Sequence, residues 1–219
     1  MRQPIRNRQS SIRNRQGRFI VLDGPDGSGK STQARLLADA LKSRGHEVLL
    51  LREPGGTATG EAVRGLLLHR GSRRMTALAE TFLFEAARAQ LVDEVIRPAL
   101  ARGAWVICDR FSLSTLVYQG IAGGIKPRVV EQLSAVATGG LWPDRYLVLW
   151  VPVSVGHERR AGRAADSMES KGAAFLCAVA NAYRLAARKH PRRYRLVDGT
   201  GTVQAVRARI WRHVEALLP

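Results

Sequence analysis

The sequence predicts an α/β fold of three layers, in which helices cover both faces of a central parallel sheet of about five strands. Short apolar runs have the length of buried strands, and they lie at Phe19–Leu22, Val48–Leu51, Trp105–Cys108, Tyr146–Val151 and Tyr194–Val197. Helical stretches separate these runs, and strands that alternate with helices form parallel sheets buried on both faces. With 219 residues and 45% hydrophobic content, the chain is long enough for one such domain.

The predicted elements follow one another in a regular order. A glycine-rich turn comes after the first strand and opens a helix over about 31–44. The second strand ends in Arg52-Glu53-Pro54-Gly55-Gly56, and helices near 61–68 and 78–100 lead to the third strand. The fourth and fifth strands follow, and a helix near 203–217 closes the chain. Ligands of such sheets bind at the carboxyl ends of the strands, so we expect the motifs that follow the strands to meet there.

Apolar runs and cysteine content indicate in which compartment of the cell the protein is expected. No run approaches the roughly 20 apolar residues of a membrane span, and the start of the chain lacks the apolar core of a secretory signal. The only cysteines are Cys108 and Cys177, which indicates no disulfide framework and a reducing compartment. We therefore expect a cytoplasmic protein with no membrane contact.

Basic residues concentrate at the start of the chain. Residues 1–18 hold six arginines and no acidic residue, and without them the formal net charge falls from +17 to +11. The segment Ile5–Gln9 recurs as Ile12–Gln16, which is too short for a repeat architecture. We predict a basic, poorly ordered tail at 1–17 before one domain at 18–219, with a targeting segment as the alternative. The tail has no aromatic residue to stack on bases, so we expect no specific nucleic-acid partner.

A phosphate-binding loop follows the first strand. The string from Gly24 to Ser31 fits G-x-x-x-x-G-K-[ST] and opens a helix. Its glycines let backbone N–H groups surround phosphate oxygens, Lys30 reaches the β- and γ-phosphates, and Ser31 can ligate Mg²⁺. The alternative is a merely flexible turn. We expect ATP to be bound by Gly24, Pro25, Asp26, Gly27, Ser28, Gly29, Lys30, Ser31 and Thr32. The fold is therefore predicted to be of the P-loop NTPase type.

Charged residues at two further strand ends indicate the reaction class. Asp109 and Arg110 follow the third strand, where Asp109 can hold Mg²⁺ with Ser31 and Arg110 can clamp an acceptor phosphate. Arg52, at the end of the second strand, is a second clamp. A Mg²⁺-bound donor that faces two arginines is the arrangement that phosphoryl transfer needs. The alternative for each arginine is an ordinary surface ion pair.

Three strings beyond the phosphate loop carry a family resemblance. They are Arg52–Thr57, Phe84–Gln90 and Asp109–Gly120, and the last departs from the family pattern where Val117 replaces the usual alanine. With them, most of residues 18–200 resembles the thymidylate kinases. The resemblance implies ATP and dTMP as substrates, Mg²⁺ as cofactor and a homodimer.

The resemblance also implies roles for single residues. Asp26 resembles the acid near the 3′-hydroxyl of the acceptor sugar, and Arg52 and Arg110 resemble the binders of its phosphate. Phe84 resembles the ring that stacks on thymine, Arg88 the residue that contacts O4, and Tyr118 the tyrosine that disfavours ribonucleotides. The implied substrate-binding set is completed by Ser114, Thr115 and Gln119.

The pairing of Phe84 with Arg88 also makes physical sense. The two residues are four apart and share a helical face. Thymine O4 only accepts hydrogen bonds, whereas cytosine presents an amino donor there, so a guanidinium favours thymine. The alternative for Phe84 and for Tyr118 is core packing.

The lid, at about 156–172, departs from the family. Members usually carry a catalytic arginine in the phosphate loop or in the lid, but the two positions here are Gly27 and Ser167. Later basic positions are replaced by Cys177 and Ala180, and the acid often found at the end of the fourth strand by Trp150. We expect Arg163 to neutralise the transferring phosphoryl group, because on a continuous lid helix it would share a face with Asp166 and Ser167. Arg159 and Arg160 are the lesser candidates, and the alternative for all three arginines is a solvated helical face.

The predicted function is transfer of the γ-phosphoryl group of ATP to dTMP, which gives dTDP and ADP. The expected catalytic residues are Lys30, Asp109, Arg110 and Arg163. The altered lid leaves two alternatives: a divergent kinase of a modified pyrimidine deoxynucleotide, or a nucleotide-binding protein with little turnover.

Overall fold

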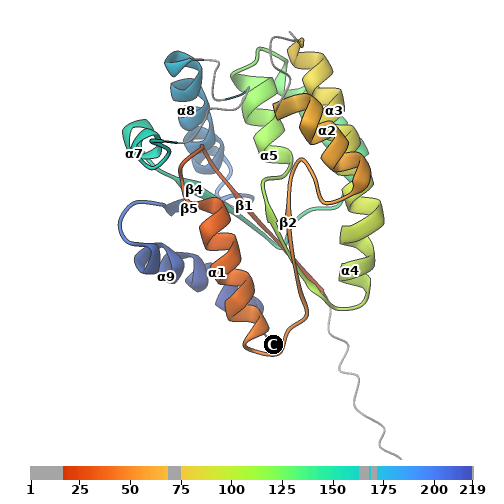
Figure 1. Ribbon diagram of the computed structural model, residues 1–219, viewed down its shortest axis with the longest axis vertical. Helices are drawn as coiled ribbons and strands as arrows, with labels where there is room; N and C mark the ends of the chain where they lie inside the picture. Colours follow the sequence, from red (N-terminus) through yellow and green to blue (C-terminus); the bar gives the residue numbers. More distant parts are fainter. Residues whose placement is uncertain (1–16, 69–74, 163–167, 169–171, 219) are drawn as a thin grey trace, which may run out of the picture.

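A five-stranded parallel sheet forms the centre of the computed structural model, which describes residues 17–68, 75–162, 168 and 172–218 (Figure 1). The strands lie in the order β2-β3-β1-β4-β5. Their bounds are β1 Arg18–Asp23, β2 Val48–Arg52, β3 Trp105–Asp109, β4 Arg145–Trp150 and β5 Arg195–Asp198. The predicted parallel α/β sheet is therefore confirmed.

Helices cover both faces of the sheet because successive strand residues point to opposite sides. On one face, Ile20 and Leu22 of β1 pack under α1 (Lys30–Lys42) and α9 (Val203–Val214). On the other face, Phe19 and Val21 belong to the core below the remaining helices. The continuous apolar run in β1 thus follows from burial on both faces.

The second face carries α3 (Ala77–Leu91), α4 (Arg97–Ala101) and α8 (Ala173–Lys189). A π-helical segment, Val92–Ile96, joins α3 to α4, so the helix predicted near 78–100 exists but contains a π-helical turn. Two further helices pack on α3: α2 (Ala58–Leu68) and α6 (Pro127–Thr138).

Four helices in the described part of the chain had no predicted bounds. They are α5 (Ser112–Thr115), which continues as the π-helical segment Leu116–Ile121, together with α6, α7 (Val153–Glu158) and α8. Figure 1 shows α7 and α8 on one side of the upper end of the sheet and α2 and α3 on the other.

The lid helix expected to place Arg163 on one face with Asp166 and Ser167 stays a prediction, because these three residues lie outside the described residues. Helix α7 ends at Glu158, and residues 159–162 form turns. Residues 163–167 and 169–171, and the tail at 1–16, lie outside the described residues. Among the residues that are described, no helix is long and apolar enough to cross a membrane.

Candidate active site

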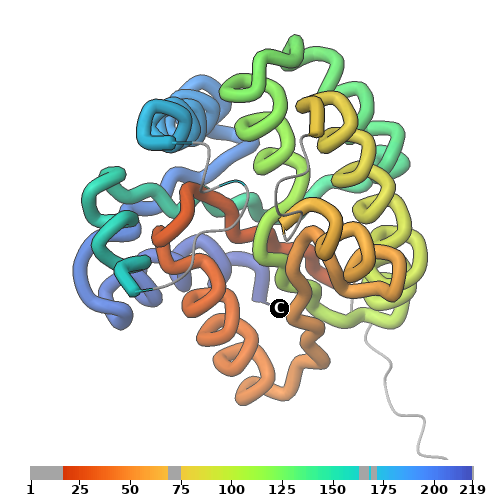
Figure 2. The backbone as a smooth tube through the Cα atoms, turned by 45° about the horizontal axis from the view of Figure 1, so that its top comes forward, coloured from red at the N-terminus to blue at the C-terminus, as the bar shows by residue number. Residues whose placement is uncertain are grey.

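A cleft of about 860 Å³ opens where β1, β2 and β3 end. The strand register brings the ends together, because Asp109 pairs with Arg52 on one side and with Leu22 on the other. Figure 2 shows the segment after β1 between α7 and α8 on one side and α2 and α3 on the other. The cleft therefore lies at the sheet edge where the motifs were expected to meet.

The phosphate loop depends on its glycines. Gly24 and Gly27 have φ values of 141° and 77°, and residues that carry a Cβ atom rarely adopt such values. A Cβ atom at Gly24 would lie 2.0 Å from Leu149 O, and one at Gly27 would lie 2.2 Å from Gly156 O. The loop is thus pressed against β4 and α7 and cannot accept larger residues at these positions.

Lys30 curls back over the loop. Its side chain is buried, and its Nζ donates to Pro25 O at 2.9 Å. Burial, aided by the charge of Arg110, lowers the pKa of Lys30 to about 8. A phosphate group in the loop would offset both effects and favour the charged ammonium.

Ser31 and Asp109 meet across the loop as predicted. Ser31 Oγ donates to Asp109 Oδ2 at 2.5 Å. Asp109 Oδ1 is buried and has no hydrogen-bond partner among the described residues. One hydroxyl and one carboxylate, with the remaining positions left to water and phosphate oxygens, are a donor set that suits Mg²⁺. The described residues contain no cluster of three or more histidine, cysteine or acidic side chains that could hold another kind of metal site.

Arg110 and Asp26 form an ion pair beside the loop. Tyr118 Oη donates to the second oxygen of Asp26 at 2.7 Å. Burial raises the pKa of Asp26, but Arg110, Lys30 and Tyr118 together outweigh it and hold that pKa well below its usual range. Arg110 itself has φ of 72°, an unusual value for a residue with a side chain, which aims its guanidinium back toward Gly24 O at 3.2 Å. The structure brings these predicted residues together.

Asp23 was not predicted, yet it organises this corner. Its carboxylate is fully buried and accepts hydrogen bonds from Ser114 Oγ at 2.7 Å, Tyr183 Oη at 2.7 Å and Tyr146 Oη at 3.0 Å. Tyr183 also accepts from Arg110 at 3.2 Å. An acid at the end of an otherwise apolar strand was the available signal for Asp23, whereas nothing local marked Tyr183.

Arg88 lies behind the cleft rather than in its lining. Its side chain is 1% exposed; its Nη2 donates to Glu53 Oε2 at 2.6 Å, and its Nη1 lies 2.8 Å from Glu85 Oε1. Nη2 also donates to Thr115 Oγ1 at 3.1 Å. Burial raises the pKa of Glu53 to about 7, although Arg88 opposes the rise. Direct contact of Arg88 with a base stays a prediction.

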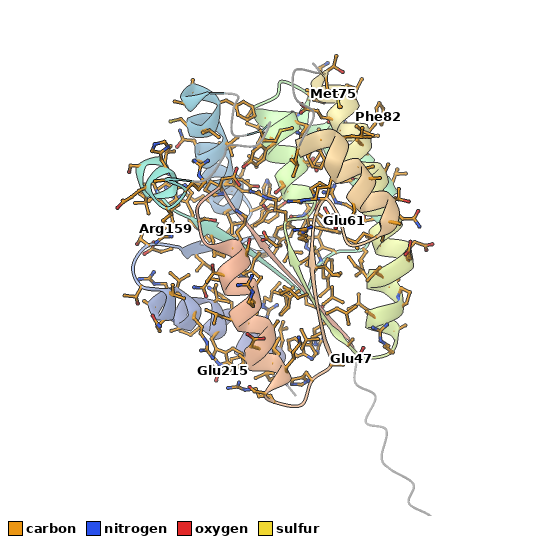
Figure 3. The ribbon with its side chains drawn as sticks, in the orientation of Figure 1. Glu47, Glu61, Met75, Phe82, Arg159 and Glu215 are labelled. Atoms are coloured by element: carbon orange, nitrogen blue, oxygen red, sulfur yellow. The ribbon has the colours of Figure 1, made fainter. Side chains whose placement is uncertain are left out.

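The remaining predicted substrate residues line the cleft. Phe84 is half-buried and lines the cleft, as do Thr115 and Gln119. Arg52 is exposed at the mouth, with its Nη2 3.3 Å from Glu61 Oε2. Figure 3 labels Glu61 on the α2 side and Arg159 on the α7 side of the same region.

The lid side brings the lesser candidates Arg159 and Arg160 to the cleft, together with the segment 199–203, which no motif marked. Arg159 Nη1 donates to Gly199 O at 3.0 Å. Trp150 donates through Nε1 to Ala180 O at 3.1 Å and lies under the guanidinium of Arg184, so it ties β4 to α8. Arg163, Asp166 and Ser167 lie outside the described residues.

Comparisons with known proteins agree on one family. Residues 22–210 match the family model described as thymidylate kinase. A thymidylate kinase of Afipia carboxidovorans is 46% identical over 208 residues, which cover 93% of this chain and 91% of the relative. One of Pseudomonas putida is 47% identical over 204 residues, covering 93% and 95%. The crystal structure of thymidylate kinase from Ehrlichia chaffeensis superposes with a TM-score of 0.72 at 30% identity and covers 91% of this chain and 98% of that one.

Proposed function

The chain belongs to the thymidylate kinase family and phosphorylates dTMP to dTDP at the expense of ATP, and we propose that this transfer takes place in the cleft at the ends of β1, β2 and β3. One observation carries the proposal. The phosphate loop with Lys30, the Ser31–Asp109 pair and the Arg110–Asp26 pair all lie along a single cleft.

The donor end is the phosphate loop. Backbone N–H groups of the loop 24–32, in which only Pro25 has none, would surround the β- and γ-phosphates. Lys30 would exchange its contact with Pro25 O for phosphate oxygens. Ser31 and Asp109 would hold Mg²⁺, which neutralises charge on the phosphate oxygens when it is bound. The buried, unpartnered Asp109 Oδ1 supports this metal role.

The acceptor end lies across the cleft. Arg110 and Arg52 would bind the phosphate of dTMP, while Asp26 would accept a hydrogen bond from the 3′-hydroxyl. Phe84 would stack on the base, and Thr115, Gln119 and Arg88 would contact its polar edge. Tyr118, fixed on Asp26, would fill the space beside the sugar.

We further propose that an arginine from the lid neutralises the transferring phosphoryl group, with Arg163 as the first candidate. Arg160 becomes the second candidate because it lines the cleft and its charge contributes to the low pKa of Asp26.

The assignment is tested by Lys30→Ala. Removing the charge that follows the phosphates into the transition state should lower dTMP-dependent ADP formation by at least about two orders of magnitude. Lys42→Ala removes an exposed lysine of the same helix and is the matched control, with near-normal turnover expected. Near-normal turnover in folded Lys30→Ala protein would contradict the placement of ATP in this loop. A panel of other nucleoside monophosphates run alongside tests the preference for dTMP.

We also propose that the enzyme is a cytoplasmic homodimer. Large apolar side chains are exposed on α2 and α3, two helices that pack on each other, namely Leu66 at 46%, Leu78 at 46% and Phe82 at 53%. Figure 3 labels Phe82 on the outer side of α3. Patches of this kind mark protein interfaces. The two free cysteines agree with a reducing compartment.

Light scattering after gel filtration tests the dimer. Wild type should have twice the 24.0 kDa mass of the chain, and Phe82→Glu should shift it toward the monomer mass. Leu185→Glu places the same charge on an exposed leucine of α8, away from the patch, and should leave the mass unchanged. A monomeric wild type at micromolar concentration would contradict the proposal.

A further inference from the structure

The side-chain amide of Gln119 is held at one end only. Gln119 lies in the π-helical segment Leu116–Ile121, is 1% exposed and lines the cleft. Its Nε2 donates to Glu80 Oε2 at 3.1 Å and lies 3.9 Å from Met168 Sδ. Its Oε1 is buried and has no hydrogen-bond partner in the part of the chain that the structure describes. A buried amide oxygen of this kind is unfavourable by itself and indicates a place where a ligand donor binds.

Glu80 decides which end of the amide faces the cleft. The oxygen and nitrogen of a glutamine amide are nearly equal in size, so the neighbours determine its orientation. An ionised carboxylate only accepts hydrogen bonds, and the sulfur of Met168 is also an acceptor, so both neighbours select the NH₂ group. The carbonyl oxygen is therefore directed away from them.

The position of Glu80 is itself fixed by its helix. Glu80 is 1% exposed in the first turn of α3. Thr76 caps this turn by accepting a hydrogen bond from Ala79 N at 3.2 Å. The carboxylate thus has little freedom to follow a rotated amide.

The orientation of this amide matters for the base. The N3 atom of thymine carries a hydrogen and donates, whereas N3 of cytosine carries a lone pair and accepts. A carbonyl oxygen that faces N3 therefore attracts thymine and repels cytosine, and an amide turned the other way would reverse this preference.

We propose that Glu80 is a positioning residue for base selection: its carboxylate orients Gln119 so that the carbonyl oxygen accepts a hydrogen bond from N3–H of thymine. This role rests on the proposed binding of dTMP in the cleft. It would add a second means of discrimination to the proposed contact of Arg88 with a different atom of the base.

The test is Glu80→Gln, an isosteric change that replaces a pure acceptor by a group that can also donate. The substrates are dTMP and 5-methyl-dCMP, which share the ring methyl and the sugar phosphate and differ only at N3 and at position 4. The ratio of kcat/KM for dTMP over 5-methyl-dCMP should fall by at least about tenfold. The loss should come from a higher KM for dTMP, with kcat and the KM for ATP near their wild-type values.

The chain offers a matched control. Glu94 also accepts from a glutamine amide, Gln90 Nε2 at 2.8 Å, but does so on the surface. Glu94→Gln makes the same chemical change outside the cleft and should leave the ratio unchanged. Glu80→Asp keeps a carboxylate at a greater distance and should give an intermediate ratio, and it replaces Glu80→Gln in the test if that variant does not fold.

A double-mutant cycle with Gln119→Met separates the outcomes. If Glu80 acts through Gln119, Gln119→Met lowers the ratio, and adding Glu80→Gln lowers it no further. An unchanged ratio in Gln119→Met would remove Gln119 from the base site and overturn the role of Glu80 with it. Two other outcomes would show that the role of Glu80 is wrong while the assignment of the cleft stands. In the first, Gln119→Met lowers the ratio but Glu80→Gln does not. In the second, Glu80→Gln lowers the ratio as much in the Gln119→Met background as it does in wild type.

Discussion

Two carboxylates share one guanidinium beneath the base end of the cleft. Glu53 and Glu85 both contact Arg88, and Ser134 Oγ donates to Glu85 Oε1 at 2.5 Å. If both carboxylates ionise, the buried group carries one uncompensated negative charge, which is expensive away from water. Burial is the largest cause that raises the pKa of Glu53 to about 7, and the nearby charge of Glu85 adds to the rise.

The raised pKa of Glu53 predicts a pH dependence of stability. Its pKa is about 7 in the folded protein against an ordinary 4.5, so the folded state binds the proton more tightly. This contribution is fully present below about pH 4.5 and is lost as the pH rises through about 7. Relative to Glu53→Gln, the free energy of unfolding of wild type should therefore decrease by about 2–3 kcal/mol between pH 4.5 and pH 8.

Urea denaturation at pH 5 and pH 8 measures this difference. Glu47→Gln changes an exposed glutamate that pairs with Arg102 at 2.7 Å, and it should leave the pH dependence as in wild type. Parallel pH profiles for wild type and Glu53→Gln would show that Glu53 stays ionised in the folded protein.

The positions of single site residues could be predicted from the sequence where the residues belong to a recognised motif. Lys30, Ser31, Asp109 and Arg110 meet as expected, since the spacing of a phosphate loop and the strand ends determines where they lie. Glu53 could not be predicted as the partner of Arg88, because that contact joins residues 35 positions apart through tertiary packing.

At the scale of elements, strands were more predictable than helices. All five predicted strands end within one residue of the observed bounds, since burial on both faces leaves uninterrupted apolar runs. Helix α8 was missed although Val179, Ala182, Tyr183 and Ala186 face the core at helical spacing, because the chain after the lid was compared only with the basic positions of the family. The two π-helical segments have no simple sequence signal.

The end of α7 at Glu158 changes how the lid arginines are compared. Residues 159–162 form turns and Arg160 lines the cleft, whereas the position of Arg163 on a lid helix stays a prediction because 163–167 lie outside the described residues. We still expect Arg163→Ala to lower kcat by about three orders of magnitude with little change in KM, because the interaction forms chiefly in the transition state. Arg160→Ala should lower kcat much less.

Steady-state kinetics of both variants decide between the arginines. Arg188→Ala, at the exposed end of α8, is the control and should behave as wild type. Ser167→Arg should restore part of the activity lost in Arg163→Ala. A large loss of kcat in Arg160→Ala alone would transfer the role to Arg160, and normal kcat in both variants would exclude either arginine.

At the scale of the whole molecule, the cleft joins segments that are far apart in the sequence. The donor side comes from the loop after β1, and the base side from α3 and the π-helical segment 116–121. The far side comes from the turn after α7, with Arg159 and Arg160, and from the segment 199–203. Part of the positive charge of the chain lies outside the domain that carries the cleft. Residues 2–16 hold five arginines and no acidic residue, and they precede the domain that carries the cleft.

Deleting residues 2–16 should separate this charge from catalysis. The deletion lowers the formal charge from +17 to +12. It keeps Gly17, where an added Cβ would lie 2.5 Å from Leu100 O, and Arg18, which pairs with Asp144 at 3.3 Å. Because no described contact of the domain is removed, kcat, KM and melting temperature should stay near the full-length values. Retention on an anionic matrix should weaken at low salt and converge with wild type as salt shortens the range of the charges.

A full-length variant with the five arginines changed to glutamine should match the deletion in retention, since the effect is one of charge and not of length. A large fall in melting temperature for the deletion, but not for the glutamine variant, would instead mean that the tail packs on the domain.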